Sequence, residues 1–153
     1  MNIAMLQRNL AALLRDELVV DDSYLSDVAA STGFAVTKDV ILAWRDLLLR
    51  QGCPLTIALL TQRGRYTIDR GEAPVFAEEL IAAFLDRFRN DDDPLVVAVA
   101  RLERALVDAQ HGSDADVVID WPCDPGIVIA RLRRGERIDD LEQGGYHMTV
   151  SVA

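Results

Sequence analysis

The sequence predicts an α+β fold, with a mostly helical N-terminal bundle and a small C-terminal strand–helix–strand unit. Over the first 110 residues, apolar side chains recur at helical spacing between capping residues, prolines and glycines. Near the C-terminal end, Val117–Trp121 and Tyr146–Val152 have the dense β-branched and aromatic composition of strands. Half of the residues are hydrophobic but only 6% are aromatic, so the core is aliphatic, which suits helix packing.

Three helices are expected before residue 53. The first spans residues 3–18, and the second starts at Asp22 or Ser23 and closes at Gly33. Thr37 is expected to cap the third helix, and Gly52 to end it. The inward stripe of this third helix is predicted to be Val40, Ile41, Trp44, Leu47 and Leu48, so Trp44 is expected in the core.

Three further helices each start with a proline in the first turn, where its missing N–H costs nothing. They begin at Pro54, Pro74 and Pro94, and Gly64 ends the first of them. The inward positions predicted for the last two are Leu80, Ile81, Phe84, Leu85 and Phe88, then Val96, Val99, Leu102 and Leu106.

The turn residues 111–114 interrupt the helical period and indicate a boundary. We therefore expect a helical bundle over 1–112, which docks on a partner, and a small α/β unit over 113–153. In the second unit Asp124 caps a short helix that ends near Gly135. Trp121, at the end of the first strand, has two interpretations: it packs the sheet on the helices, or it is an exposed interface anchor.

The formal net charge of −9, with a single lysine, disfavours nucleic acid as a partner, because phosphate binding requires clustered cations. No apolar run reaches the length of a membrane span, and no signal peptide is recognisable. Cys53 and Cys123 have no metal-type or disulfide-framework spacing and are expected as reduced thiols in a cytoplasmic protein.

No catalytic or metal-ligating constellation is found, so no catalytic and no metal residue is expected. The two histidines, His111 and His147, have no further ligands at helical or hairpin spacing, although Cys123 near His147 is conceivable. The acidic run 91–93 lacks the glycine and distal glutamate of a calcium loop and is interpreted as a helix cap before Pro94.

One basic cluster stands out in this acidic chain. It consists of Arg131, Arg133, Arg134 and Arg137 around Gly135. Cations at the C-terminal end of a helix interact favourably with the helix dipole and would stabilise the short helix before Gly135. They would also suit acidic side chains of a bound peptide or a partner, and the two interpretations are compatible.

Two stretches together resemble a known family. One runs from Ala43-Trp44-Arg45-Asp46 through Gln51-Gly52-Cys53-Pro54 to Arg63-Gly64-Arg65, and the other from Asp120-Trp121-Pro122-Cys123-Asp124-Pro125 through Arg133-Arg134-Gly135 to Thr149-Val150-Ser151. Both are similar to the small partner subunits of the multinuclear non-haem iron oxygenases that modify ribosomally made peptides. The methanobactin and thiaglutamate pathways use such pairs of subunits. Within the family, the more specific expectation is the thiaglutamate type, whose substrate is the C-terminal cysteine of a carrier peptide.

The resemblance implies a heterodimer in which the iron and the oxygen chemistry belong to a larger barrel subunit. This chain would recognise the leader of the precursor peptide, which adds as a strand to its small sheet. The expected peptide-binding residues are Val118, Asp120, Trp121, Arg131, Arg134, Tyr146, Met148 and Val150. The alternatives are a stand-alone helical binding or regulatory module and a self-contained enzyme.

Overall fold

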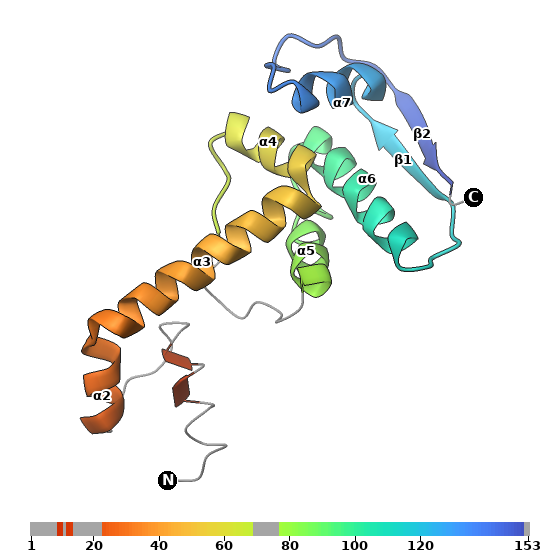
Figure 1. The fold of residues 1–153 in the computed structure, drawn as a ribbon. Helices are drawn as coiled ribbons and strands as arrows, with labels where there is room; N and C mark the ends of the chain where they lie inside the picture. Colours follow the sequence, from red (N-terminus) through yellow and green to blue (C-terminus); the bar gives the residue numbers. More distant parts are fainter. Residues whose placement is uncertain (1–8, 11, 14–22, 69–76, 152–153) are drawn as a thin grey trace. The chain divides into compact units, whose positions relative to one another are not determined.

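The α+β class is confirmed in the computed structural model, which describes residues 9–10, 12–13, 23–68 and 77–151. The elements are α2 (Ser23–Ala30), α3 (Thr32–Gly52), α4 (Pro54–Gln62), α5 (Ala77–Asp86), α6 (Pro94–Gln110), β1 (Val117–Trp121), α7 (Pro125–Arg133) and β2 (Tyr146–Val150) (Figure 1). Most of the helix expected over residues 3–18 lies outside the described residues. The helix start expected at Pro74 lies outside them as well.

The chain divides into two compact units at positions other than 112/113. The first comprises Met1–Leu47 with Ile68–Ala73, and the second Leu48–Thr67 with Pro74–Ala153. The physical reason is that the C-terminal sheet does not stand apart from the helices. It packs on α6, and α7 packs on α4, so these helices share one core with the sheet.

In the first unit, the helix break expected at Gly33 and Thr37 is wrong. Both residues lie inside α3, and the Thr37 hydroxyl donates to the Gly33 carbonyl at 2.9 Å rather than capping a new helix. Ser31 is the cap instead, because its hydroxyl accepts from the Phe34 N–H at 3.1 Å.

The expected burial of Trp44 is also wrong. Its side chain is 59% exposed, on a helix face where Val36, Val40 and Leu47 are exposed as well. Helical periodicity identifies a shared face, but it cannot say what covers that face.

In the second unit, the helix starts at Pro54 and Pro94 are confirmed. The carboxylate of Asp93 accepts the Leu95 N–H at 2.9 Å, so the acidic run is a cap, as expected. Gly64 follows α4 with φ +64°, a left-handed conformation in which glycine carries no Cβ strain.

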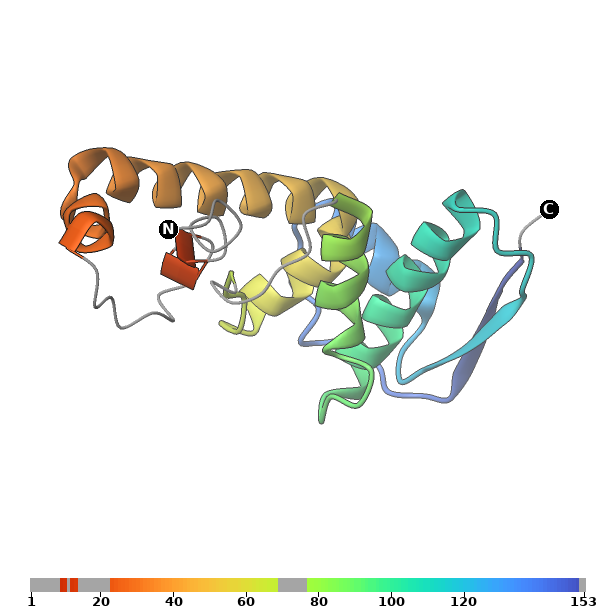
Figure 2. The same cartoon turned by 90° about the horizontal axis from the view of Figure 1, so that it is seen from below.

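Helix α6 lies between α5 and the sheet (Figures 1 and 2) and contacts both. Its buried side chains include the predicted Val96, Val99 and Leu102, whereas Leu106, also predicted inward, is 45% exposed. On α5, Leu80, Phe84 and Leu85 are buried as predicted. No helix among the described residues is long and apolar enough to cross a bilayer.

Strands β1 and β2 pair antiparallel, with Val117 opposite Val150 and Trp121 opposite Tyr146. The predicted strand starts are confirmed, while the second strand ends at Val150. The intervening α7 is capped by Asp124, whose carboxylate accepts the Gly126 N–H at 2.8 Å, and Gly135 follows with φ +68°. The Gly144 N–H donates to the Pro122 carbonyl and extends the pairing past Tyr146.

Candidate functional site

The sheet formed by β1 and β2 has no third strand in the described part of the chain, so each strand keeps one edge without a strand neighbour. One face is covered: Ile119 is fully buried and Trp121 is 2% exposed. On the opposite face Val118 is 56% exposed, and Asp120 lies across from His147, whose ring nitrogen is 2.7 Å from the carboxylate. Strand pairing is therefore complete on one side of each strand only.

A side chain of α6 reaches the free edge of β1. The Arg101 guanidinium donates to the Val118 carbonyl at 3.3 Å, from outside the strand pair. In an antiparallel pair, successive residues direct their peptide groups alternately toward the partner strand and away from it. We infer that Val118 and Asp120 present N–H and C=O to the free edge of β1, and that Thr149 and His147 do the same on β2.

The expected strand residues of the peptide site fall on different faces. Val118 and Asp120 are exposed on the outer face, whereas Met148 is half-buried on the inner one. Val150 is also half-buried on the inner face, and Tyr146 is 36% exposed at the strand start. Trp121 is buried, which agrees with the interpretation that it packs the sheet on the helices and not with an exposed interface anchor. A peptide along this sheet would therefore meet backbone edges and outer-face side chains, not the indole.

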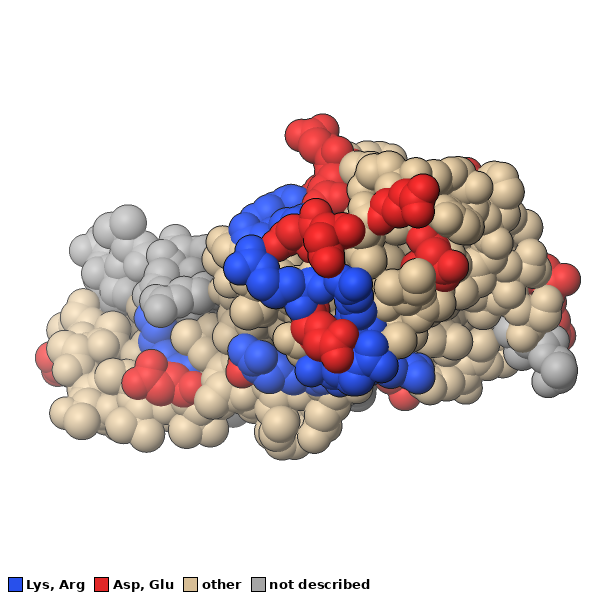
Figure 3. Space-filling model, turned by 90° about the horizontal axis from the view of Figure 1, so that it is seen from above, with Lys and Arg blue, Asp and Glu red and all other residues tan. Residues whose placement is uncertain are grey.

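Arg131 and Arg134 are already paired within the chain. Arg131 bonds Asp140 at 2.5 Å, and Arg134 bonds Glu136 at 2.6 Å. On the face shown in Figure 3, the basic residues gather in one region with acidic residues among them. The basic cluster is thus largely neutralised by its own carboxylates.

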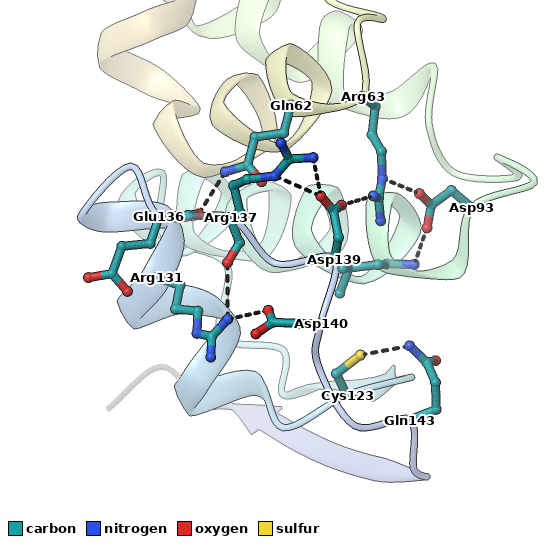
Figure 4. A network of polar contacts seen from close by, with 11 residues as sticks. Gln62, Arg63, Asp93, Cys123, Arg131, Glu136, Arg137, Asp139, Asp140 and Gln143 are labelled. Carbon is teal, nitrogen blue, oxygen red and sulfur yellow. Dashed lines mark hydrogen bonds and ion pairs between the residues drawn. The ribbon is translucent and has the colours of Figure 1, made fainter.

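The Arg131–Asp140 pair belongs to a network of polar contacts that holds the segment between α7 and β2 (Figure 4). Asp139 accepts from both Arg63 (2.8 Å) and Arg137 (2.6 Å), and Arg63 also bonds Asp93 at 3.1 Å. The Arg137 and Arg63 guanidiniums hold the pKa of Asp139 below its usual range. The Gln62 amide donates to the Glu136 carbonyl at 2.9 Å. The segment leading into β2 is therefore tied to the C-terminal end of α4.

A groove of about 440 Å³ lies between α5, α6 and the start of β1. Its lining residues are Leu85, Asp86, Arg89, Asn90, Ala100, Arg101, Arg104, Ala105, Asp108 and Val117. The groove thus borders the same end of β1 that Arg101 reaches. Sequence reasoning did not identify it, since its residues come from three separate elements.

Sequence reasoning also missed Glu103, which is 4% exposed. Its two carboxylate oxygens accept the N–H groups of Leu55 (2.7 Å) and Thr56 (2.9 Å) at the start of α4. Burial raises the pKa of Glu103, and these hydrogen bonds counteract part of that effect. In the sequence, Glu103 falls on the same helical face of α6 as the apolar residues Val96 and Val107. A carboxylate at such an inward position is the signal that could have identified it.

Both cysteines are free and buried. Burial, and secondarily the Glu103 carboxylate, raises the pKa of the Cys53 thiol. Burial likewise raises the pKa of Cys123, whose sulfur lies 3.4 Å from the Gln143 amide nitrogen. Residues 23–68 and 77–151 contain no group of three or more His, Cys, Asp or Glu side chains that could hold a metal ion.

No family model, no curated protein and no solved structure matches this chain.

Proposed function

We propose that this chain is the non-catalytic, peptide-recognising subunit of a heterodimeric iron-dependent oxygenase that modifies a ribosomally synthesised peptide in the cytoplasm. The observation that carries the proposal is the two-stranded sheet, whose strands each have an edge without a strand neighbour in the described chain. The family resemblance of residues 43–65 and 120–151 supplies the kind of enzyme.

The chemistry that such an edge offers is β-strand addition. An extended peptide donates to and accepts from the main chain of the edge strand, which gives affinity with little sequence dependence. On β1 the peptide groups available for this are those of Val118 and Asp120, and on β2 those of His147 and Thr149. Side chains beside the edge then determine which peptide is preferred.

In this proposal Arg131 and Arg134 act indirectly. Each is committed to a carboxylate of the segment 135–145. Removing either arginine would loosen the entry to β2 rather than delete a contact with the peptide. Their contribution to recognition is thus to hold the sheet in place.

The division of labour between the subunits places the iron in the larger chain. The family resemblance of residues 43–65 and 120–151 supports that assignment. This chain's own task is to bind and orient the precursor peptide.

The test is co-expression of this chain with a neighbouring-gene product that is a candidate for the larger subunit, followed by affinity purification through this chain. We expect a one-to-one complex, with iron measured by mass spectrometry partitioning entirely with the larger chain after separation. Tightly held iron, or turnover of a peptide, in this chain alone would contradict the proposal.

A further inference from the structure

We propose that the peptide adds to the free edge of β1, and that Arg101 selects peptides carrying an acidic side chain beside that edge. This inference rests on the proposed function, since it requires that the chain binds an extended peptide. It assigns the docking edge, the selecting residue and the charge of the ligand.

The first observation is that Arg101 is exposed and forms no ion pair with any residue that the structure describes. Its hydrogen bond to the Val118 carbonyl is 3.3 Å long, at the weak end of the range for an N–H donor. Most other arginines of the second unit are bound to carboxylates at shorter distances, such as Arg65 with Asp91 at 2.5 Å. With respect to the described residues, Arg101 is thus a cation without an anionic partner, held against a backbone carbonyl.

The second observation is the groove beside it. Leu85, Ala100 and Ala105 are buried and form its floor, while charged side chains form its rim. The groove borders Val117, so a strand paired with β1 would run along its margin. Such a strand would direct alternate side chains toward this space.

The third observation is the charge balance of the rim. The groove is lined by three arginines (Arg89, Arg101 and Arg104) and two aspartates (Asp86 and Asp108). This gives a local excess of one positive charge, although the whole chain has a net charge of −9. Asp86 contacts both Arg89 (3.1 Å) and Arg104 (3.4 Å), and Asp108 contacts Arg104. Both carboxylates are therefore engaged, and the excess charge resides on Arg101.

Peptide binding would exchange one bond for two stronger ones. The incoming peptide N–H replaces the Arg101 guanidinium at the Val118 carbonyl. The released guanidinium then pairs with a Glu or Asp of the peptide, a charge-assisted and potentially bidentate contact. The exposed Val118 side chain offers an apolar contact on the outer face of the same edge.

The probe for the test is a synthetic set of fluorescent ten-residue peptides with alternating Val and Thr. One scanned position carries Glu, Gln or Lys, and binding to the purified full chain is measured by anisotropy. We expect the best Glu peptide to bind at least about tenfold more tightly than its Gln and Lys counterparts, which is the scale of one charge-assisted hydrogen bond. The preference should weaken as salt is raised.

Arg101→Gln is expected to abolish the preference for Glu while leaving the Gln peptide bound as before. The matched control is Arg133→Gln, because Arg133 is also exposed and has no ion pair in the described chain, but lies on α7 away from this groove. An unchanged preference for Glu in Arg101→Gln, or its equal loss in the control, would overturn the assignment of Arg101.

The edge is tested by a pair of proline variants. Val118→Pro removes an outward N–H from β1, and Thr149→Pro removes one from β2, while both spare the ladder between the strands. We expect loss of binding in the first and retention in the second, with folding verified by circular dichroism. The reverse result would identify β2 as the docking edge and overturn the proposal.

Failure of this inference and failure of the proposed function give different experimental results. Binding without a preference for Glu, or no binding by any peptide of the set, overturns this inference even where the iron-bearing complex forms as expected. Absence of that complex in the pull-down overturns the proposed function itself.

Discussion

The carboxylate of Glu103 accepts a hydrogen bond from the Leu55 N–H at 2.7 Å, although 48 residues separate the two in sequence. Its second oxygen accepts the Thr56 N–H. Cys53, at the N-cap of α4, makes no side-chain capping bond, so α6 supplies the cap that the local sequence lacks. The same buried contact places an anion at the positive end of the α4 helix dipole.

Replacing Glu103 by Ala should destabilise the folded chain by about 2–4 kcal/mol, because two buried backbone donors lose their acceptor. Glu103→Gln retains the shape and one acceptor oxygen and should cost less. Equilibrium unfolding in urea measures both. A Glu103→Ala variant as stable as the wild type would contradict the capping role.

Asp91 should make stability sensitive to acid. The Arg65 guanidinium, bound through two hydrogen bonds, holds the pKa of Asp91 below its usual range. A carboxyl whose folded pKa is lowered stabilises the fold above its unfolded pKa of about 4, and this contribution is lost as the pH falls through the lowered value.

Asp91→Asn should therefore be less stable than the wild type at pH 7, with the difference vanishing on acidification. Asparagine keeps an acceptor for the Asp93 N–H but loses the charge and one of the two oxygens that accept from Arg65. Unfolding curves between pH 7 and pH 2 provide the measurement. A difference that stays constant over that range would show that the charge of Asp91 is not responsible.

Asp139→Asn should loosen the segment that leads into β2. It removes the charged partner of Arg63 and Arg137 together, so backbone amides of residues 136–150 should exchange hydrogen severalfold faster. Asp92→Asn is a suitable control, because that side chain is exposed and forms no hydrogen bond or ion pair with the residues that the structure describes. Equal exchange in the two variants would argue against the role of this network.

Both thiols should react slowly in the folded chain. Cys53 is fully buried and Cys123 is 2% exposed, and burial raises the pKa of each, which lowers the fraction of reactive thiolate. Titration with a chromogenic disulfide reagent should detect almost no thiol under native conditions and two after denaturation. Rapid labelling of Cys53 in the native state would show that its surroundings open readily.

The local sequence was sufficient where the determining interaction is itself local. Asp93 and Asp124 each cap the helix that starts at the next residue, and the dense run Val117–Trp121 is a strand over the predicted range. Proline in the first turn and glycine at positive φ act within a few residues, so their effects could be predicted from spacing.

Two local sequence signals were misleading, the glycine at position 33 and the apolar period that includes Trp44. An isolated glycine costs a helix only about 1 kcal/mol, too little to end α3 once Ser31 caps its start. Trp44 repeats with the apolar period of its helix, yet it is exposed, because burial depends on which other element covers that face.

The amino-acid sequence by itself determined the α+β class, the caps of α6 and α7 and the two strands, since these depend on neighbours a few positions away. Only the tertiary structure decided that the Glu103 carboxylate caps a distant helix and that Asp139 joins Arg63 of the α4 end to the segment before β2. It also decided that Arg101 meets the edge of β1. Contacts between residues far apart in the chain depend on how helices and strands pack, and that packing is a collective property of the whole core.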